Sequence, residues 1–256
     1  MNDDTRTEGK LQPAEAAPDE ALLDDLVFAN RILFDHGVVD AFGHVSVRHD
    51  KAADRFLLAR NMPPAMVTRA DIIEFDMDGN PTNANGRRVF LERFIHSAIF
   101  QARPDVHAVV HSHSPEVVPF SAAKGTALQA IWHMCGFLGD GVPIFEIRDV
   151  AGDGTDLLVR NVELGKALAD ALGNASVILM RGHGATVVGS DLMEAVYRAV
   201  YTQMNAEIQL HAHQLGTVTF LSKKEAQAAS AAISTQMGRA WDLWKNQLKP
   251  SGTGDH

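Results

Sequence analysis

Two histidines separated by one residue, His111 and His113, end the apolar run Ala108–Val110. A short apolar run bounded by polar residues predicts a β-strand, and residues i and i+2 of a strand point to the same face. Both imidazoles can therefore bind one metal ion. Two ligands do not complete the shell of zinc or manganese, so the pair alone is equally compatible with two surface histidines. The residues that follow predict a helix that begins with Ser114 as its N-cap.

Other side chains suited to metal chemistry lie elsewhere in the chain. His183 stands between two glycines in a predicted strand-to-strand turn, where glycine lets the backbone approach an ion closely. Glu92 and His96 lie one helical turn apart and share a face, and Glu92 could act as a ligand or a general acid/base. Without a metal nearby, His183 is an ordinary turn residue and Glu92 a helix-end charge. By contrast, His211 and His213 lie in a predicted helix, where residues two apart diverge, so we interpret them as solvated.

Helical and strand periodicities alternate along the chain, which predicts a mixed α/β layer protein. Helices are predicted from Asp19 to Gly37, at 91–102, after Ser114, at 162–172, and in two long closing segments capped by Ser190 and by the capping box Ser222–Glu225. Strands are predicted at 45–48, 56–59, 72–75, 108–113, 142–145, 176–180 and 185–188. No Gly-x-Gly-x-x-Gly or P-loop follows a strand, so a Rossmann domain is not indicated.

Composition limits the possible partners and locations. The 256 residues carry a net charge of -9, which argues against a nucleic-acid partner and leaves no basic patch for membranes. Cys135 is the single cysteine, so no internal disulfide is possible and a cytoplasmic location is expected. No segment approaches the roughly 20 apolar residues of a membrane span. We expect a disordered arm at 1–18, one domain at 19–248 and a flexible tail at 249–256.

Three motifs together resemble the class II aldolase/adducin superfamily over about residues 20 to 215. They are the segment Gly43-His44-Val45-Ser46-Val47-Arg48, the pairing of Glu92 with His111-Ser112-His113, and Arg181-Gly182-His183-Gly184. The resemblance implies a central, mostly antiparallel sheet flanked by helices. It further implies a divalent metal held by the histidines of the second and third motifs (His111, His113 and His183), with Glu92 as the catalytic carboxylate. Catalytic members of this family are typically homotetramers or larger, with sites at subunit interfaces. The apolar stripe from Leu192 to Val200 in the first closing helix can pack on the body or on a neighbouring copy.

The sequence departs from the sugar-phosphate aldolases of that family where they bind phosphate. The loop 59–62 reads Ala-Arg-Asn-Met and the residues 89–91 read Val-Phe-Leu, so hydroxyl groups for a phosphate dianion are missing. Arg60 can bind a carboxylate bidentately, and Phe90 and Trp132 could flank a flat ring. His44 stands where those aldolases have Asn, and we expect it to contact substrate together with Ser46. In these features the chain resembles the branch that decarboxylates hydroxylated aromatic or pyridine dicarboxylates.

The expected function is therefore that of a metal-dependent carbon–carbon lyase, most simply a decarboxylase of a hydroxylated aromatic or heteroaromatic carboxylate. The ion, Zn²⁺ or Mn²⁺ with Fe²⁺ as an alternative, would absorb the electron density released when the bond breaks. Glu92 or His133 would return a proton to the ring. The alternatives are an aldolase acting on an unphosphorylated hydroxy-acid, a mononuclear iron oxygenase, and a non-catalytic binding module.

Overall fold

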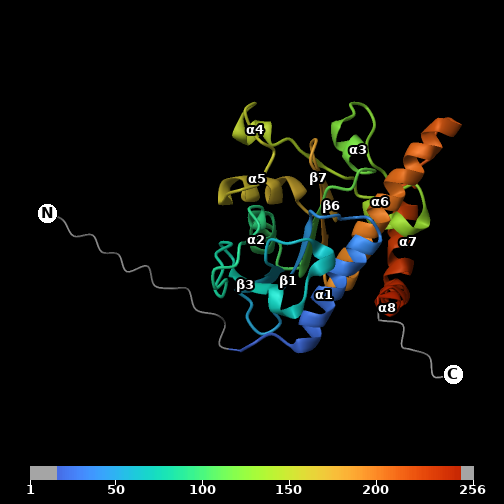
Figure 1. The fold of residues 1–256 in the computed structure, drawn as a ribbon. Coiled ribbons are helices and arrows are strands. Elements are labelled where there is room, and N and C mark those ends of the chain that lie inside the picture. The colour runs from blue at the N-terminus through green and yellow to red at the C-terminus, as the bar shows by residue number, and fades with distance from the viewer. Residues whose placement is uncertain (1–15, 249–256) are drawn as a thin grey trace, which may run out of the picture.

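The computed structural model describes residues 16–248 and shows one mixed β-sheet with helices on both faces (Figure 1). The seven strands run in the order β3-β2-β1-β4-β7-β6-β5. They are β1 (His44–Arg48), β2 (Arg55–Ala59), β3 (Ile72–Asp76), β4 (Ala108–Ser112), β5 (Ile144–Phe145), β6 (Val177–Met180) and β7 (Gly184–Gly189). All neighbouring strands are antiparallel except β5 and β6. The predicted fold class, one α/β domain built on a mostly antiparallel sheet, is confirmed.

The helices follow the predicted pattern with local differences. They are α1 (Glu20–Asp35), α2 (Arg93–Ala102), α3 (Val118–Ala122), α4 (Arg148–Ala151), α5 (Val162–Leu172), α6 (Leu192–Leu215), α7 (Lys223–Ser234) and α8 (Met237–Gln247), with short 3-10 turns η1 (Pro64–Met66), η2 (Arg69–Asp71) and η3 (His133–Leu138). Residues 1–15 and 249–256 lie outside the described residues. The predicted tail and most of the predicted arm fall there, so the expected boundaries at 18/19 and 248/249 stay predictions.

Several predicted boundaries are wrong. Ser114 does not cap a helix, because a turn intervenes and α3 begins only at Val118. The cap of α6 is Asp191, whose side chain accepts the Glu194 N–H, and not Ser190. The last predicted helix is broken into α7 and α8, although its capping box at Ser222 is confirmed.

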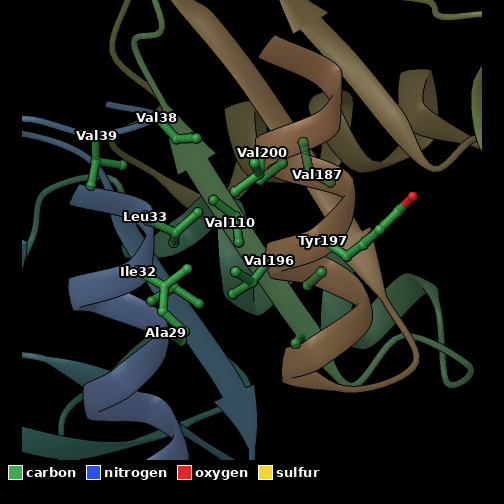
Figure 2. Close-up of a cluster of buried hydrophobic side chains, with 14 of the residues drawn as sticks. Ala29, Ile32, Leu33, Val38, Val39, Val110, Val187, Val196, Tyr197 and Val200 are labelled. Atoms are coloured by element: carbon green, nitrogen blue, oxygen red, sulfur yellow. The ribbon is translucent and has the colours of Figure 1, made fainter. Parts of the chain in front are cut away.

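The sheet separates two hydrophobic cores, one on each face. Figure 2 shows the first, where Val110 of β4 and Val187 of β7 pack against Ile32 of α1 and Val196 of α6. Each of these side chains is at most 2% exposed, and burying one stabilises the fold by about 1.5–3 kcal/mol. The apolar stripe of α6 is thus used within its own chain, so it lends no support to a subunit contact.

The second core lies between the sheet and helices α2 and α5. Val109 of β4 belongs to it, together with Ile95 of α2 and Leu168 of α5. Because side chains alternate along a strand, His111 points to the same face as Val109. The alternation of side chains along β4 therefore directs His111 toward the face of the sheet that α2 covers. Glu92, the residue before α2, lies on the same side.

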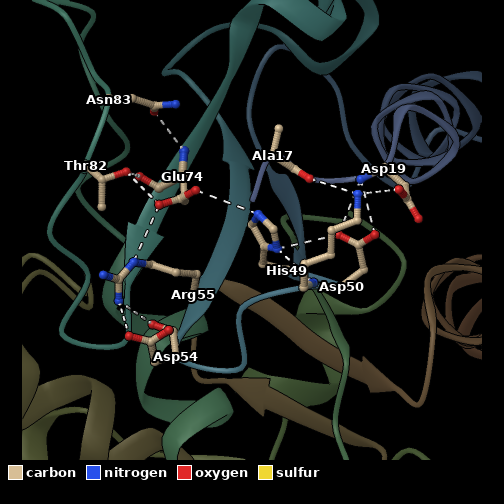
Figure 3. A network of polar contacts seen from close by, with 10 residues as sticks. Ala17, Asp19, His49, Asp50, Asp54, Arg55, Glu74, Thr82 and Asn83 are labelled. Atoms are coloured by element: carbon tan, nitrogen blue, oxygen red, sulfur yellow. Dashed lines mark hydrogen bonds and ion pairs between the residues drawn. The ribbon is translucent and has the colours of Figure 1, made fainter. Parts of the chain in front are cut away.

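A polar network fastens the far ends of β1, β2 and β3 (Figure 3). His49 follows β1, and its Nε2 lies 3.8 Å from Glu74 Oε2, while Arg55 Nε lies 3.5 Å from Glu74 Oε1. Thr82 donates to the same carboxylate at 3.0 Å. Glu74 is 5% exposed, and a buried carboxylate is tolerated where donors surround it. The network is structural and lies at the opposite end of β1 from His44.

Candidate metal centre

The ends of three adjacent strands bring the predicted ligands together. The register sets His111 of β4 opposite both His44 of β1 and Thr186 of β7. The turn between β6 and β7 carries His183, and β7 begins at once with Gly184. A Cβ on Gly184 would lie 1.9 Å from the Ser112 carbonyl oxygen, so only glycine permits this close approach of β7 to β4.

Three imidazoles and one carboxylate converge at this end of the sheet. The Nε2 atoms of His111 and His113 are 3.0 Å apart, and those of His113 and His183 are 2.9 Å apart. Glu92 Oε2 lies 3.6 Å from His111 Nε2 and 3.5 Å from His183 Nε2. Metal–nitrogen bonds of about 2.1 Å separate neighbouring ligand atoms by about 3.0 Å in octahedral and about 3.4 Å in tetrahedral geometry. The donor set and its spacing therefore fit a divalent transition metal.

Backbone carbonyl groups fix the tautomers of two of these histidines. His111 Nδ1 donates to the Ala185 carbonyl at 3.1 Å, and His183 Nδ1 donates to the Leu157 carbonyl at 2.9 Å. A carbonyl oxygen only accepts, so Nδ1 carries the proton and Nε2 keeps its lone pair for a metal. Burial also lowers the pKa of His183 to about 4, which keeps that ring neutral.

Glu92 occupies a position suited to either ligation or proton transfer. It is the residue before α2, it is 7% exposed, and its Oε1 accepts the Val159 N–H at 3.0 Å. Burial raises the pKa of Glu92 to about 7, while the Val159 N–H and the charge of Arg160 act in the opposite direction. A carboxyl group with a pKa near neutrality can both accept and return a proton.

The loop before α5 supports two members of this cluster. Its Leu157 carbonyl holds His183 and its Val159 N–H holds Glu92. Leu157 has φ +69°, a left-handed conformation that is uncommon for leucine and characteristic of functional sites. No sequence pattern predicts this conformation, because a leucine next to polar residues indicates no special backbone.

His44 lies beside the cluster, with further polar groups behind it. Its ring is 5.1 Å from the His111 ring and 4.5 Å from the Phe90 ring. Its Nδ1 contacts His96 Nε2, and His96 Nδ1 contacts Ser46 Oγ, both at 2.6 Å. Ser46 is fully buried, so it reaches the cluster only through His96 and His44. Sequence reasoning placed His96 on the same face as Glu92 but gave it no role.

Of the remaining predicted site residues, Phe90 contacts His44 and Arg60 follows the end of β2 beside β1, whereas Trp132 and His133 are not gathered at the cluster. Arg60 follows β2, and its Nε donates to Asp71 Oδ1 at 2.7 Å; its terminal amino groups have no hydrogen-bond partner among the described residues. Trp132 packs against the core under α6 and donates to Cys135 Sγ at 3.0 Å. His133 is exposed at the start of η3. Phe90 packs on the opposite core, so the expected sandwich of Phe90 and Trp132 around one ring does not form within a chain.

A large groove also lies away from this cluster. It has a volume of about 1020 Å³ and runs along the far ends of β1 and β4, past residues such as Arg48, Lys51 and Trp241. None of the predicted site residues lines it. We therefore assign the chemistry to the cluster, where the ligand atoms converge, and not to this groove, although the groove is large.

Comparison with known proteins agrees with this fold. A solved structure, an aldolase II superfamily protein from Pseudomonas syringae, superimposes with a TM-score of 0.75 over 93% of this chain and 96% of its own, and at 22% identity it shows the fold. The family model described as Class II Aldolase and Adducin N-terminal domain matches residues 24–210. The chain therefore belongs to the class II aldolase and adducin family.

Two relatives lie closer in sequence. Decarboxylase tropJ of Talaromyces stipitatus is 37% identical over 244 residues, which cover 86% of this chain and 91% of the relative. The 3,4-dihydroxyphthalate decarboxylase of Arthrobacter keyseri is 30% identical over 206 residues, which cover 75% and 78%. With such relatives and a Glu/His cluster that could bind a metal, the chain is an enzyme of the class II aldolase superfamily. Among the described residues, no helix has the length and apolar composition needed to cross a lipid bilayer.

Proposed function

We propose that this enzyme is a metal-dependent decarboxylase of a hydroxylated aromatic or heteroaromatic carboxylate. The observation that carries the proposal is the cluster of Glu92, His111, His113 and His183, whose ligand atoms all lie within 4.8 Å of one another. The resemblance to proteins named decarboxylases supports the reaction, since two of them match over most of the chain. The hydroxyl-poor segments 59–62 and 89–91 argue against a phosphorylated substrate.

The three histidines would hold the ion through Nε2. A divalent cation bound there supplies a Lewis acid that stabilises the electron pair left when the bond to the carboxyl group breaks. Zn²⁺ and Mn²⁺ suit imidazole and carboxylate ligands, and Fe²⁺ is the alternative. The partly buried surroundings would strengthen this electrostatic effect, because the local dielectric constant is lower than in bulk water.

Glu92 would manage the proton. Loss of carbon dioxide leaves the electron pair on the ring carbon, and one proton must reach that carbon. Burial disfavours the charged form of Glu92, so its carboxyl group could carry this proton and deliver it. The Val159 N–H holds Oε1, which leaves Oε2 as the oxygen that faces the histidines.

A flat, anionic ring would lie against the edge formed by His44 and Phe90. The two rings are in contact at 4.5 Å, and such a wall favours an aromatic substrate over a sugar. We assign Arg60 to a second carboxylate, since its terminal amino groups remain available for a bidentate contact. Trp132 and His133 stay predictions for a homo-oligomer, tetrameric or larger, in which a neighbouring copy supplies them.

The proposal is tested with protein loaded separately with Zn²⁺, Mn²⁺ and Fe²⁺. Each form is incubated with hydroxybenzene and hydroxypyridine carboxylates and, in parallel, with hydroxy-acids and sugar phosphates. Released carbon dioxide, released aldehyde and consumed oxygen are measured separately. We expect carbon dioxide from an aromatic acid without oxygen uptake. Aldehyde as the only product would favour the aldolase, and oxygen uptake with Fe²⁺ would favour the oxygenase.

A further inference from the structure

A chain of three hydrogen-bonding groups runs from the interior of the sheet to the edge of the cluster. Ser46 Oγ lies 2.6 Å from His96 Nδ1, and His96 Nε2 lies 2.6 Å from His44 Nδ1. Ser46 and His96 are 0% exposed and His44 is 5% exposed. The other nitrogen of His44, Nε2, has no hydrogen-bond partner within residues 16–248. The chain therefore ends in a single group that remains available, next to His111.

The side chains of Ser46, His96 and His44 are electrically neutral. No carboxylate contacts Ser46, His96 or His44 in the part of the chain that the structure describes, and burial lowers the pKa of His96 to about 3. A neutral imidazole carries one N–H, so only two arrangements of protons satisfy both contacts. In one, Ser46 donates to His96, His96 donates to His44, and His44 Nε2–H points outward. In the other, every bond is reversed and His44 Nε2 is an acceptor.

The partner at His44 Nε2 decides between these arrangements. Carboxylate and phenolate oxygens only accept hydrogen bonds, so an anionic ligand selects the outward-pointing N–H. We propose that Ser46 and His96 are positioning residues that set His44 as a neutral donor to an anionic oxygen of the aromatic acid bound at the cluster. The inference rests on the proposed function for its ligand, and it assigns a specific use to the direction of the two internal hydrogen bonds.

This arrangement gives anion recognition without a buried cation. A buried charge costs several kcal/mol, whereas aligned hydrogen bonds polarise one another and strengthen the last donor. The arrangement also discriminates, because an amide or ester of the same acid offers a weaker acceptor. Hydrogen bonds to charged groups are strong enough that losing this one should weaken binding by about tenfold to a hundredfold.

Two substitutions of His96, by side chains of nearly equal size, test the direction of the hydrogen bonds that run from Ser46 to His44. The side chain of His96→Gln can accept from Ser46 and donate to His44, whereas that of His96→Met accepts only weakly and cannot donate. Zinc-loaded wild-type protein, His96→Gln and His96→Met are titrated with 2-hydroxybenzoate by calorimetry, and bound zinc is measured in each. We expect His96→Gln to stay within about threefold of wild type and His96→Met to lose tenfold or more, at equal zinc content. Equal affinity of the two variants overturns the inference, as does wild-type protein that does not bind the anion.

A double-mutant cycle shows whether His96 acts through His44. In a His44→Ala background, His96→Met should have no further effect on the dissociation constant, because the transmitting ring is gone. The same loss in both backgrounds overturns the inference. Should His96→Met not fold, Ser46→Ala takes its place in the same cycle with the same expectations. If the cycle shows coupling between His96 and His44 but no aromatic acid releases carbon dioxide, the proposed reaction is wrong and the anion-binding role of these residues stands. Failure of the inference and failure of the proposed function are therefore distinguishable.

Discussion

Replacing Gly184 with alanine should damage the metal site without removing a ligand. The added Cβ would lie 1.9 Å from the Ser112 carbonyl oxygen and 3.1 Å from the His113 Cα. Carbon and oxygen atoms that are not bonded approach to roughly 3 Å at the least, so β7 or β4 must shift by about 1 Å. Overpacking of this kind costs about 1–3 kcal/mol of stability.

The same shift acts directly on the ligand atoms. His113 and His183 lie on the two sides of this contact, and their Nε2 atoms are 2.9 Å apart. Metal–ligand distances tolerate only about 0.2 Å, so a displacement of about 1 Å should lower zinc affinity by about 100-fold or more. The affinity is measured by competition with a chromophoric chelator, and the stability of metal-free protein by urea unfolding.

Gly154 provides the matched control. A Cβ at Gly154 would meet no atom within 4 Å, so Gly154→Ala should leave both stability and zinc affinity within the error of measurement. If Gly184→Ala binds zinc as tightly as wild type while unfolding at the same urea concentration, the argument that only glycine fits between β4 and β7 is refuted.

The other predictions concern the ligands, the carboxylate and the assembly. His111→Ala should lose most of the bound metal, measured by elemental analysis, and retention of one equivalent with full turnover would contradict the ligand assignment. Glu92→Gln should keep the fold and metal but lose about 10²-fold in turnover; normal turnover with a normal melting curve reduces Glu92 to a structural charge. Because burial raises the pKa of Glu92 from 4.5 to about 7, the native state binds the extra proton. The free energy of unfolding of metal-free wild type, relative to that of Glu92→Gln, should therefore fall by up to about 3 kcal/mol as pH rises from 4.5 to above about 7. An increase in this difference, measured by urea unfolding over the same pH range, would contradict the prediction. Phe42 and Leu91 are 66% and 58% exposed, and we expect a neighbouring copy to cover them; sedimentation of a monomer at micromolar concentration would exclude this.

The parts of the site that could be predicted from the sequence depend on local geometry. Strand alternation sets the direction of His111, a glycine-flanked turn places His183 between β6 and β7, and helix periodicity puts Glu92 and His96 on one side of α2. These rules operate over a few residues, so a single sequence is enough to apply them. The same local rules predict that His211 and His213 lie on a helix and face solvent, and both are exposed on α6.

The misplaced residues depend on contacts between distant segments. The sequence predicts that Trp132 flanks a ring opposite Phe90 and that His133 donates a proton to that ring, but the segment before Trp132 follows α6. Asn205 accepts the Ile131 N–H at 3.1 Å and donates to the Gln129 carbonyl at 2.7 Å. A buried amide that replaces a missing strand partner satisfies backbone groups that would otherwise be unpaired. Nothing in the sequence near residue 131 indicates that α6 would supply it.

The same distinction separates the ligands from the groups that orient them. A ligand is recognisable by its residue type, whereas its support is a backbone carbonyl or N–H that any residue possesses. Leu157 and Val159 orient His183 and Glu92 through main-chain atoms alone, so their side chains carry no trace of that role. Ser46 and His96, in contrast to Leu157 and Val159, act on His44 through their side chains. These polar side chains stand among core residues at the spacing of a strand and of a helix. Polar residues that share a buried face with predicted ligands are therefore the part of a metal site's surroundings that a sequence can reveal, and the main-chain part requires the fold.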